Sequence, residues 1–147
     1  MTLPTHATVA AAIGMTANYN ISQLEVYVLG GLFPDLIESI ICLGSYKQFT
    51  KIHRQFFHWW VIYLIPFCLL LLFAHTFPFY IVSYGLLFLL GCFTHLFFDL
   101  LTPTGIPLKK STKRYSIKLY TTGHIGELVI FCISIFIIFL RIHGGLL

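Results

Sequence analysis

A histidine and an aspartate stand four residues apart in the otherwise apolar stretch GCFTHLFFDLLTPTG, residues 91–105. On a helix, His95 and Asp99 would share one face and could point at the same object. That object is either a polar partner, reached through an interhelical hydrogen bond, or a species that needs one nitrogen and one oxygen ligand. The pair therefore leaves two interpretations open, a structural contact and a metal site.

Other histidines and acids lie near the ends of apolar segments and could join this pair. They are His6, Asp35, His53, His58, His124 and Glu127. Imidazole and carboxylate donors without thiolate suit zinc or another divalent first-row ion. A catalytic zinc takes three protein ligands and keeps one position open, so this set is large enough for two ions. Two adjacent ions would suit the hydrolysis of a phosphate ester.

Each candidate also has a purely structural interpretation. His124 and Glu127 could cap a helix, because an acidic residue in the first turn suits the helix dipole. Asp35 follows a proline and could simply end a helix. His53 and His58 are about 140° apart around an ideal helix, so they converge only if the helix starts between them.

The composition places the chain in a membrane. Of its 147 residues, 58% are hydrophobic and only 10% are charged, and the mean hydropathy is +0.88. A soluble domain carries about 25% charged residues. The length allows a single domain, residues 1–147. The N-terminal stretch has no basic segment before its apolar part, which argues against a cleaved signal peptide.

The apolar runs predict an all-α membrane-embedded bundle. Three runs are long enough to cross a bilayer, at residues 56–74, 79–101 and 125–140. The first 40 residues contain two shorter apolar pieces, at 6–16 and 21–33, separated by the polar ANYN turn. We expect these pieces to form a hairpin of short helices, re-entrant or packed into the bundle, with His6 close to Asp35.

The basic residues predict the orientation. Residues 102–124 form a loop rich in proline and glycine that carries five basic residues and no acid, and three more basic residues precede the first span. These residues are Lys47, Lys51, Arg54, Lys109, Lys110, Lys113, Arg114 and Lys118. By the positive-inside rule this side is cytoplasmic, with Arg141 as the exception. The loop would also attract anionic lipid headgroups.

The predicted topology brings the metal-ligand candidates to one depth, at the cytoplasmic ends of the spans. Ionisable groups in a bilayer normally face the bundle interior, so their clustering favours a common site. His75 and His143 fall on the opposite side and have no predicted role. Arg54, beside His53, could hold a phosphate through two parallel hydrogen bonds or anchor the chain at the membrane surface.

The remaining motifs exclude other functions. The four cysteines, Cys42, Cys68, Cys92 and Cys132, show no CxxC spacing and are expected to pack as small apolar side chains. Neither a phosphate-binding loop nor a nucleophile elbow is present. We also find no basic and aromatic surface typical of nucleic-acid binding.

Five blocks of the sequence resemble a known family. THATVAAAIG, GGLFPDLIES, HRQFFHWW, GCFTHLFFDLLTPTGIPL and GELV are similar to the successive blocks of the YdjM-type proteins, bacterial inner-membrane proteins described as metal-dependent hydrolases by inference. That family is distantly similar to zinc-dependent phospholipase C and P1 nuclease. The resemblance implies zinc and assigns metal binding or chemistry to His6, Asp35, His53, His58, His95, Asp99 and Glu127.

The chain departs from the family pattern at two positions. Ile37 stands where the family usually has a second acid, with Glu38 adjacent, and Trp59 follows His58 where the family has serine. His124 matches no family position and is an additional candidate ligand. These differences leave open the number of metals and whether the member is catalytic.

The sequence thus predicts a membrane-bound hydrolase of a phosphoester, such as a phospholipid or another lipid phosphate, at the cytoplasmic face of a bacterial inner membrane. One or more divalent ions, with zinc favoured, would activate water, and Asp35 or Glu127 would bridge metals or act as general base. The alternative is a metal-stabilised membrane scaffold or a small ion or proton transporter. The sequence predicts no oligomeric state.

Overall fold

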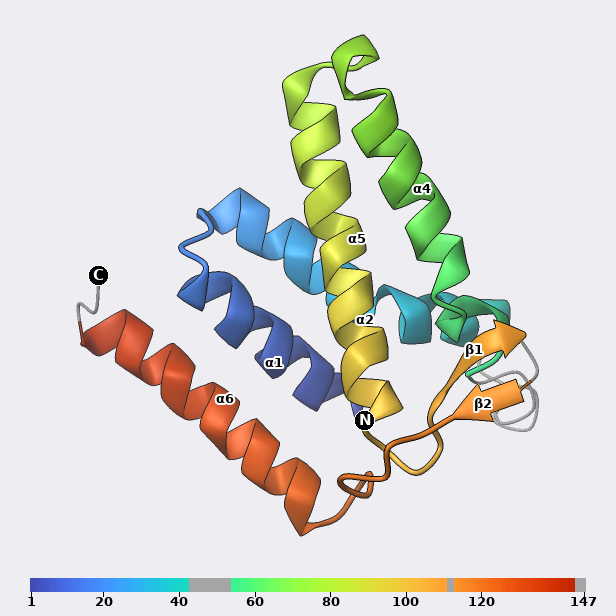
Figure 1. Ribbon diagram of the computed structural model, residues 1–147. Coiled ribbons are helices and arrows are strands. Elements are labelled where there is room, and N and C mark those ends of the chain that lie inside the picture. The colour runs from blue at the N-terminus through green and yellow to red at the C-terminus, as the bar shows by residue number, and fades with distance from the viewer. Residues whose placement is uncertain (43–53, 111–112, 145–147) are drawn as a thin grey trace.

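The computed structural model describes residues 1–42, 54–110 and 113–144, and most of this part of the chain is helical (Figure 1). A two-stranded antiparallel sheet is its only departure from an all-α fold in the described ranges. In chain order the elements are α1 (Leu3–Thr16), α2 (Ile21–Ile41), the 3-10 turn η1 (Phe56–His58), α4 (Val61–Leu72), the 3-10 turn η2 (Ala74–Thr76), α5 (Phe79–Leu100), β1 (Ile106–Lys110), β2 (Lys113–Tyr115) and α6 (Ile125–His143).

Two described helices are long and apolar enough to cross a membrane, α5 with 22 residues and α6 with 19. The sequence predicted a third span at residues 56–74, and the structure does not confirm it. Residues 56–58 form a separate 3-10 turn, Trp59 is extended, and α4 has only 12 residues. A helix of that length is about 18 Å long, well short of a bilayer core of about 30 Å.

Helix α2 is longer than predicted because it continues through Pro34 to Ile41. It begins at a capping box, in which the Asn20 side chain accepts from the Gln23 backbone and the Gln23 side chain accepts from the Asn20 backbone. The interpretation of Asp35 as a helix terminator is therefore wrong. The acid lies inside the helix, two turns from its end.

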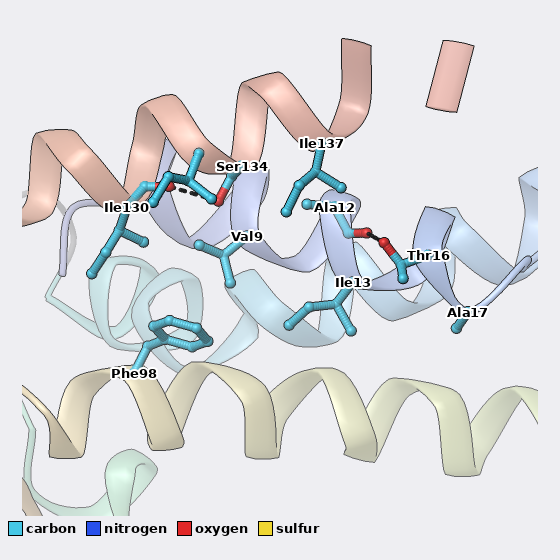
Figure 2. A pocket seen from close by; sticks show the side chains of 10 residues that line it. Val9, Ala12, Ile13, Thr16, Ala17, Phe98, Ile130, Ser134 and Ile137 are labelled. Carbon is cyan, nitrogen blue, oxygen red and sulfur yellow. Dashed lines mark hydrogen bonds between the residues drawn. The ribbon is translucent and has the colours of Figure 1, made fainter. Parts of the chain in front are cut away.

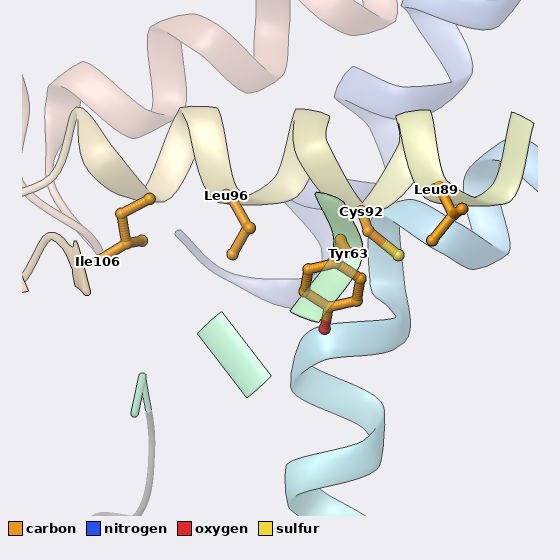
Figure 3. Close-up of a cluster of buried hydrophobic side chains, with 5 residues drawn as sticks. All are labelled: Tyr63, Leu89, Cys92, Leu96 and Ile106. Atoms are coloured by element: carbon orange, nitrogen blue, oxygen red, sulfur yellow. The ribbon is translucent and has the colours of Figure 1, made fainter. Parts of the chain in front are cut away.

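The helices form two groups whose axes are inclined to each other. Figure 1 shows α4 and α5 as an antiparallel pair, with α1, α2 and α6 inclined to them, and the N-terminus beside the C-terminal end of α5. A core of Leu89, Cys92 and Leu96 on α5 packs on Tyr63 of α4 and on Ile106 of β1 (Figure 3).

The cysteines are free, as their spacing predicts, but only half of them lie in the protein interior. Cys42 and Cys92 are buried, whereas Cys68 on α4 and Cys132 on α6 are exposed. The packing role expected for all four therefore holds for two.

The segment predicted as a basic loop contains the β-hairpin. Strands β1 and β2 pair with Ile106 opposite Tyr115 and Pro107 opposite Arg114. Gly105 enters β1 with a φ of +62°, and a Cβ there would lie 1.9 Å from the Tyr115 carbonyl oxygen, so only glycine fits. The hairpin also fixes the turn before α4.

That turn is held to the hairpin by two tryptophans. The indole N–H groups of Trp59 and Trp60 both donate to the carbonyl oxygen of Leu108, at 3.2 and 2.8 Å. Because His58 directly precedes this pair, the hairpin helps to fix the position of its imidazole.

Candidate metal centre

Four elements bring histidines and acids to one place inside the protein. Helix α2 contributes Gly31, Asp35 and Glu38, which are spaced i, i+4, i+7 and so lie along one face. Helix α5 contributes His95 and Asp99, again four residues apart. His6 comes from α1 and His58 from η1. All of these side chains are buried, and His58, His95 and Asp99 are at most 1% exposed.

Glycines let α2 and α5 cross in direct backbone contact. A Cβ at Gly30 would lie 2.0 Å from the Phe88 carbonyl oxygen, and one at Gly91 would lie 2.1 Å from that of Tyr27. Small residues at such crossings are typical of membrane helices. The close approach brings the carbonyl oxygen of Gly31 to 2.8 Å from His95 Nδ1.

The first group of possible metal ligands is Asp35, His58 and His95. The Nε2 atoms of the two histidines are 3.1 Å apart. Asp35 Oδ1 lies 3.3 Å from the first and 3.7 Å from the second. With metal–nitrogen bonds of about 2.0–2.1 Å, the ligand atoms of a tetrahedral zinc are roughly 3.3 Å apart. The spacing therefore suits three protein ligands of one ion.

Neighbouring acceptors fix the two imidazoles in the orientation that a metal requires. His58 Nδ1 is 3.0 Å from Glu38 Oε1, and His95 Nδ1 is 2.8 Å from the Gly31 carbonyl oxygen. A carboxylate and a carbonyl only accept, so both Nδ1 atoms donate. In the neutral rings both Nε2 lone pairs then face each other, which needs a shared proton or a cation between them. Such outer partners of metal-binding histidines are typical of metal sites.

The second group is His6, His95 and Asp99. Asp99 Oδ1 lies 3.3 Å from His6 Nε2, and its Oδ2 lies 3.6 Å from His95 Nε2. The His6 and His95 rings stack, with centroids 3.6 Å apart and planes 12° apart. The stacking places the two imidazoles side by side, and Asp99 directs one oxygen toward each of them. The three side chains could hold a metal ion.

Two buried atoms of this group make no well-aligned hydrogen bond within the described residues, although an ionisable partner lies 3.3–3.4 Å from each. They are Nε2 of His6 and Oδ2 of Asp99. Buried polar atoms are nearly always bonded to something, so such atoms call for a ligand. A bound cation is one partner that would satisfy both atoms.

Arg54 is enclosed beside the second group. Its two terminal nitrogens donate to Thr102 Oγ1 at 2.6 Å and to Asp99 Oδ1 at 2.9 Å, and its backbone N–H donates to Glu38 Oε2 at 3.2 Å. The N-terminal ammonium of Met1 also donates to Asp99 Oδ1, at 2.5 Å. Arg54 has a φ of +60°, which a non-glycine residue rarely adopts. These contacts hold it there, and it positions Asp99.

The charges of the cluster favour a bound cation. Three buried carboxylates, Asp35, Glu38 and Asp99, face two cations in the described part of the chain, the Arg54 guanidinium and the N-terminal ammonium of Met1. Buried charges need compensation, so one negative charge is left to be balanced by protonated histidine or by a metal.

The pKa values of two groups outside the spanning helices agree with this charge balance. Burial lowers the pKa of His58, but hydrogen bonds to Asp35, Asp99 and Glu38 outweigh it and raise the pKa to about 10. Burial raises the pKa of Asp35, but its hydrogen bond with His58 and the nearby imidazoles hold it well below its usual range. Without a metal, His58 is therefore the protonated partner of ionised carboxylates.

The other sequence candidates lie elsewhere. Glu127 accepts from the backbone and hydroxyl of Thr2, at 2.5 and 2.8 Å, and from the Gly123 backbone at 2.6 Å. It thus ties the starts of α1 and α6 together and belongs to neither group. His124 is exposed at the N-terminal end of α6, and His53 lies outside the described residues. His75 and His143 are exposed, away from the cluster.

Sequence reasoning missed three members of the site: Glu38, Gly31 and Thr102. The i, i+4, i+7 spacing of Gly31, Asp35 and Glu38 would have indicated the polar face of α2 if the predicted helix had continued through Pro34. Thr102, which donates to the Asp99 carbonyl oxygen at 2.8 Å, lies in the LTPTG block just after α5. Thr102 belongs to the site only because the fold brings the Arg54 guanidinium within hydrogen-bond distance of its hydroxyl.

Two membrane-length helices and a buried histidine–carboxylate cluster that could hold a metal ion define the class, a helical membrane protein with a potential metal centre. The model of the YdjM inner membrane protein family matches residues 1–144, and the chain therefore belongs to that family. No curated protein and no solved structure matches the chain. The distant similarity to zinc-dependent phospholipase C and P1 nuclease stays a prediction.

Proposed function

We propose that this protein is a membrane-bound, metal-dependent hydrolase of phosphoesters, with zinc as its metal and a lipid phosphate as its substrate. The observation that supports the proposal most strongly is the facing pair of Nε2 atoms on His58 and His95, with Asp35 beside them. Three protein ligands, two histidines and a carboxylate among the common sets, are typical of catalytic zinc sites, with a position left for water or substrate.

In this proposal Asp35, His58 and His95 hold one ion, and His6 and Asp99 hold a second. When bound, zinc supplies Lewis acidity to a phosphoryl oxygen and lowers the pKa of water. The side chain of Asp35 is 12% exposed, the most open of the ionisable groups, whereas those of His58 and His95 are fully enclosed. Asp35, which stays ionised, is therefore the ligand beside which water or substrate would bind.

Two other residues receive positioning roles. Arg54 holds Asp99 rather than presenting both of its terminal nitrogens to a phosphate, because these nitrogens already bond Thr102 and Asp99. Glu127 holds the starts of α1 and α6 together. Both roles replace the more direct ones that the sequence suggested.

The proposed site faces the cytoplasm at the level of the lipid headgroups. The basic residues after α5, among them Lys109, Lys113, Arg114 and Lys118, lie on or next to the β-hairpin that supports His58. Lysine and arginine gather on the cytoplasmic side of membrane proteins and attract anionic lipid. A phosphoester at that level would meet the metal centre.

The test is hydrolysis by purified protein in detergent. Phosphatidic acid and a water-soluble phosphodiester are offered to wild-type protein, to chelator-treated protein, and to chelator-treated protein with zinc restored. The expected result is turnover that is lost on chelation, recovered with zinc and absent in Asp35→Asn. Glu25→Gln, the same type of change at an exposed position of α2, should be fully active. No turnover of either substrate by zinc-loaded wild type would contradict the proposal.

A second candidate, a metal-stabilised membrane scaffold, is favoured by one observation. His58, His95 and Asp99 are almost completely enclosed, as ligands of structural zinc are. In that case chelation would lower the thermal stability of the protein, and zinc-loaded wild type would hydrolyse nothing.

A further inference from the structure

An apolar groove of about 610 Å³ opens between α1 and α6, with Phe98 of α5 at its floor (Figure 2). Its volume is in the range of small-molecule sites. The lining consists of Val9, Ala12, Ile13, Thr16, Ala17, Phe98, Ile130, Ile133, Ser134 and Ile137.

The groove offers no free polar group to a ligand. Thr16 and Ser134 carry the only side-chain hydroxyls of the lining, and each donates to its own helix. Thr16 bonds the Ala12 carbonyl oxygen at 2.7 Å, and Ser134 bonds that of Ile130 at 2.8 Å, as the dashed lines in Figure 2 show. The occupant that fits such a lining is a hydrocarbon chain.

The groove runs along α6, one of the two membrane-length helices that the structure describes. Helices α1 and α6 run parallel, because Glu127 bonds Thr2 where both helices begin and Arg141 donates to the Thr16 carbonyl oxygen at 2.6 Å where both end. Ile130 and Ile137 lie about 8 and 18 Å along the membrane-length helix α6. That interval covers much of one leaflet of hydrocarbon, about 15 Å.

At one end of the groove the lining residues lie close in sequence to residues of the metal centre. Val9 stands one turn after His6 on α1, and Phe98 directly precedes Asp99 on α5. Ile130 stands one turn after Glu127 on α6. A chain in the groove would therefore have its polar headgroup at the level of His6 and Asp99.

We propose that this groove binds an acyl chain of a phosphate-bearing lipid and so places the phosphoester of that lipid at the metal centre. The proposal rests on the proposed function, since it names the part of the substrate that the hydrolase recognises. It predicts that chain length and headgroup phosphate both matter for binding.

The experiment uses zinc-loaded protein in detergent and a phosphatidic acid with a photoreactive diazirine near the end of one acyl chain. Cross-linked residues are mapped by mass spectrometry, with a diacylglycerol of the same chains as the probe without phosphate. The expected result is labelling concentrated on Ile13, Ile133 and Ile137, and stronger with phosphatidic acid than with diacylglycerol.

A matched pair of variants tests the groove itself. Ile137→Trp fills it and should lower groove labelling by about tenfold, the loss expected when two methylene groups no longer fit. Ile135→Trp places the same bulk on a neighbouring position that is 43% exposed and outside the lining, and should label as wild type. Both variants should keep wild-type zinc content, which shows that they fold.

The outcomes separate this inference from the proposed function. Labelling spread equally over the exposed face of α6, or unchanged in Ile137→Trp, overturns the groove even if the soluble phosphodiester is hydrolysed. Equal labelling by diacylglycerol also overturns it, because headgroup recognition is then absent. Phosphate-dependent groove labelling without any hydrolysis supports the groove and contradicts the hydrolase.

Discussion

Replacement of Glu38 by glutamine tests how the centre holds its histidines. Glu38 is fully buried, and its two oxygens accept from His58 Nδ1 at 3.0 Å and from the Arg54 backbone at 3.2 Å. Glutamine has the same shape but only one acceptor oxygen, so its amide nitrogen must face one of these two donors. The change removes the charge that orients and polarises the His58 imidazole.

Loss of such an outer partner lowers metal affinity by about 10- to 100-fold. This corresponds to about 1.4 to 2.7 kcal/mol of zinc-binding free energy. We expect Glu38→Gln to insert into the membrane and to bind zinc within this weaker range. The dissociation constant is measured by competition with a chromophoric chelator on purified protein in detergent.

Glu25→Gln is the matched control, because Glu25 is an exposed acid on the same helix. It should bind zinc as tightly as wild type. Unchanged affinity in Glu38→Gln would refute the argument that Glu38 fixes the metal-binding form of His58. An equal loss in both variants would also refute it, because the effect would then be one of overall charge.

Three further results are expected. Zinc affinity should rise by up to about tenfold per pH unit between about pH 6 and 9. The carboxylates keep His58 protonated up to a pKa of about 10, and zinc binding must release that proton. Zinc titrations at several pH values check this, and an affinity that does not change with pH would contradict it. Gly91→Ala places a Cβ 2.1 Å from the Tyr27 carbonyl oxygen and should cost about 1–3 kcal/mol of stability. Its melting temperature in detergent should fall, whereas Gly85→Ala, which meets the end of a flexible side chain, should melt close to wild type. Glu127→Gln should lower the melting temperature, since Glu127 ties α1 to α6, but should keep full zinc content in elemental analysis. Loss of zinc in this variant would instead show that Glu127 is a metal ligand.

The long helices follow from the sequence because their cause is local. The unbroken apolar runs before Leu101 and after Ile125 predict α5 and α6 to within a few residues. The four-residue spacing of His95 and Asp99 predicts their shared face, which the structure shows turned to the interior. Periodicity and hydropathy act within one helix, so a single sequence carries them.

Elements that depend on contacts between distant residues were missed. The indole N–H groups of two tryptophans donate to the Leu108 carbonyl oxygen where the chain breaks before α4. Composition alone cannot distinguish that arrangement from a longer membrane span. The β-hairpin has strands of five and three residues, too short for a clear alternating pattern. Pro34 looks like a helix stop, yet α2 continues through it, packed on α5 through Gly30.

The metal content of the purified protein tests the central claim most directly. Untagged wild type, His95→Ala and His75→Ala are prepared side by side in detergent under zinc-replete conditions and analysed for bound elements. His95 belongs to both ligand groups, whereas His75 is exposed at the far end of α4. We predict one to two zinc ions in wild type and in His75→Ala, and loss of at least one in His95→Ala. No metal in wild type, or an unchanged content in His95→Ala, would contradict the account.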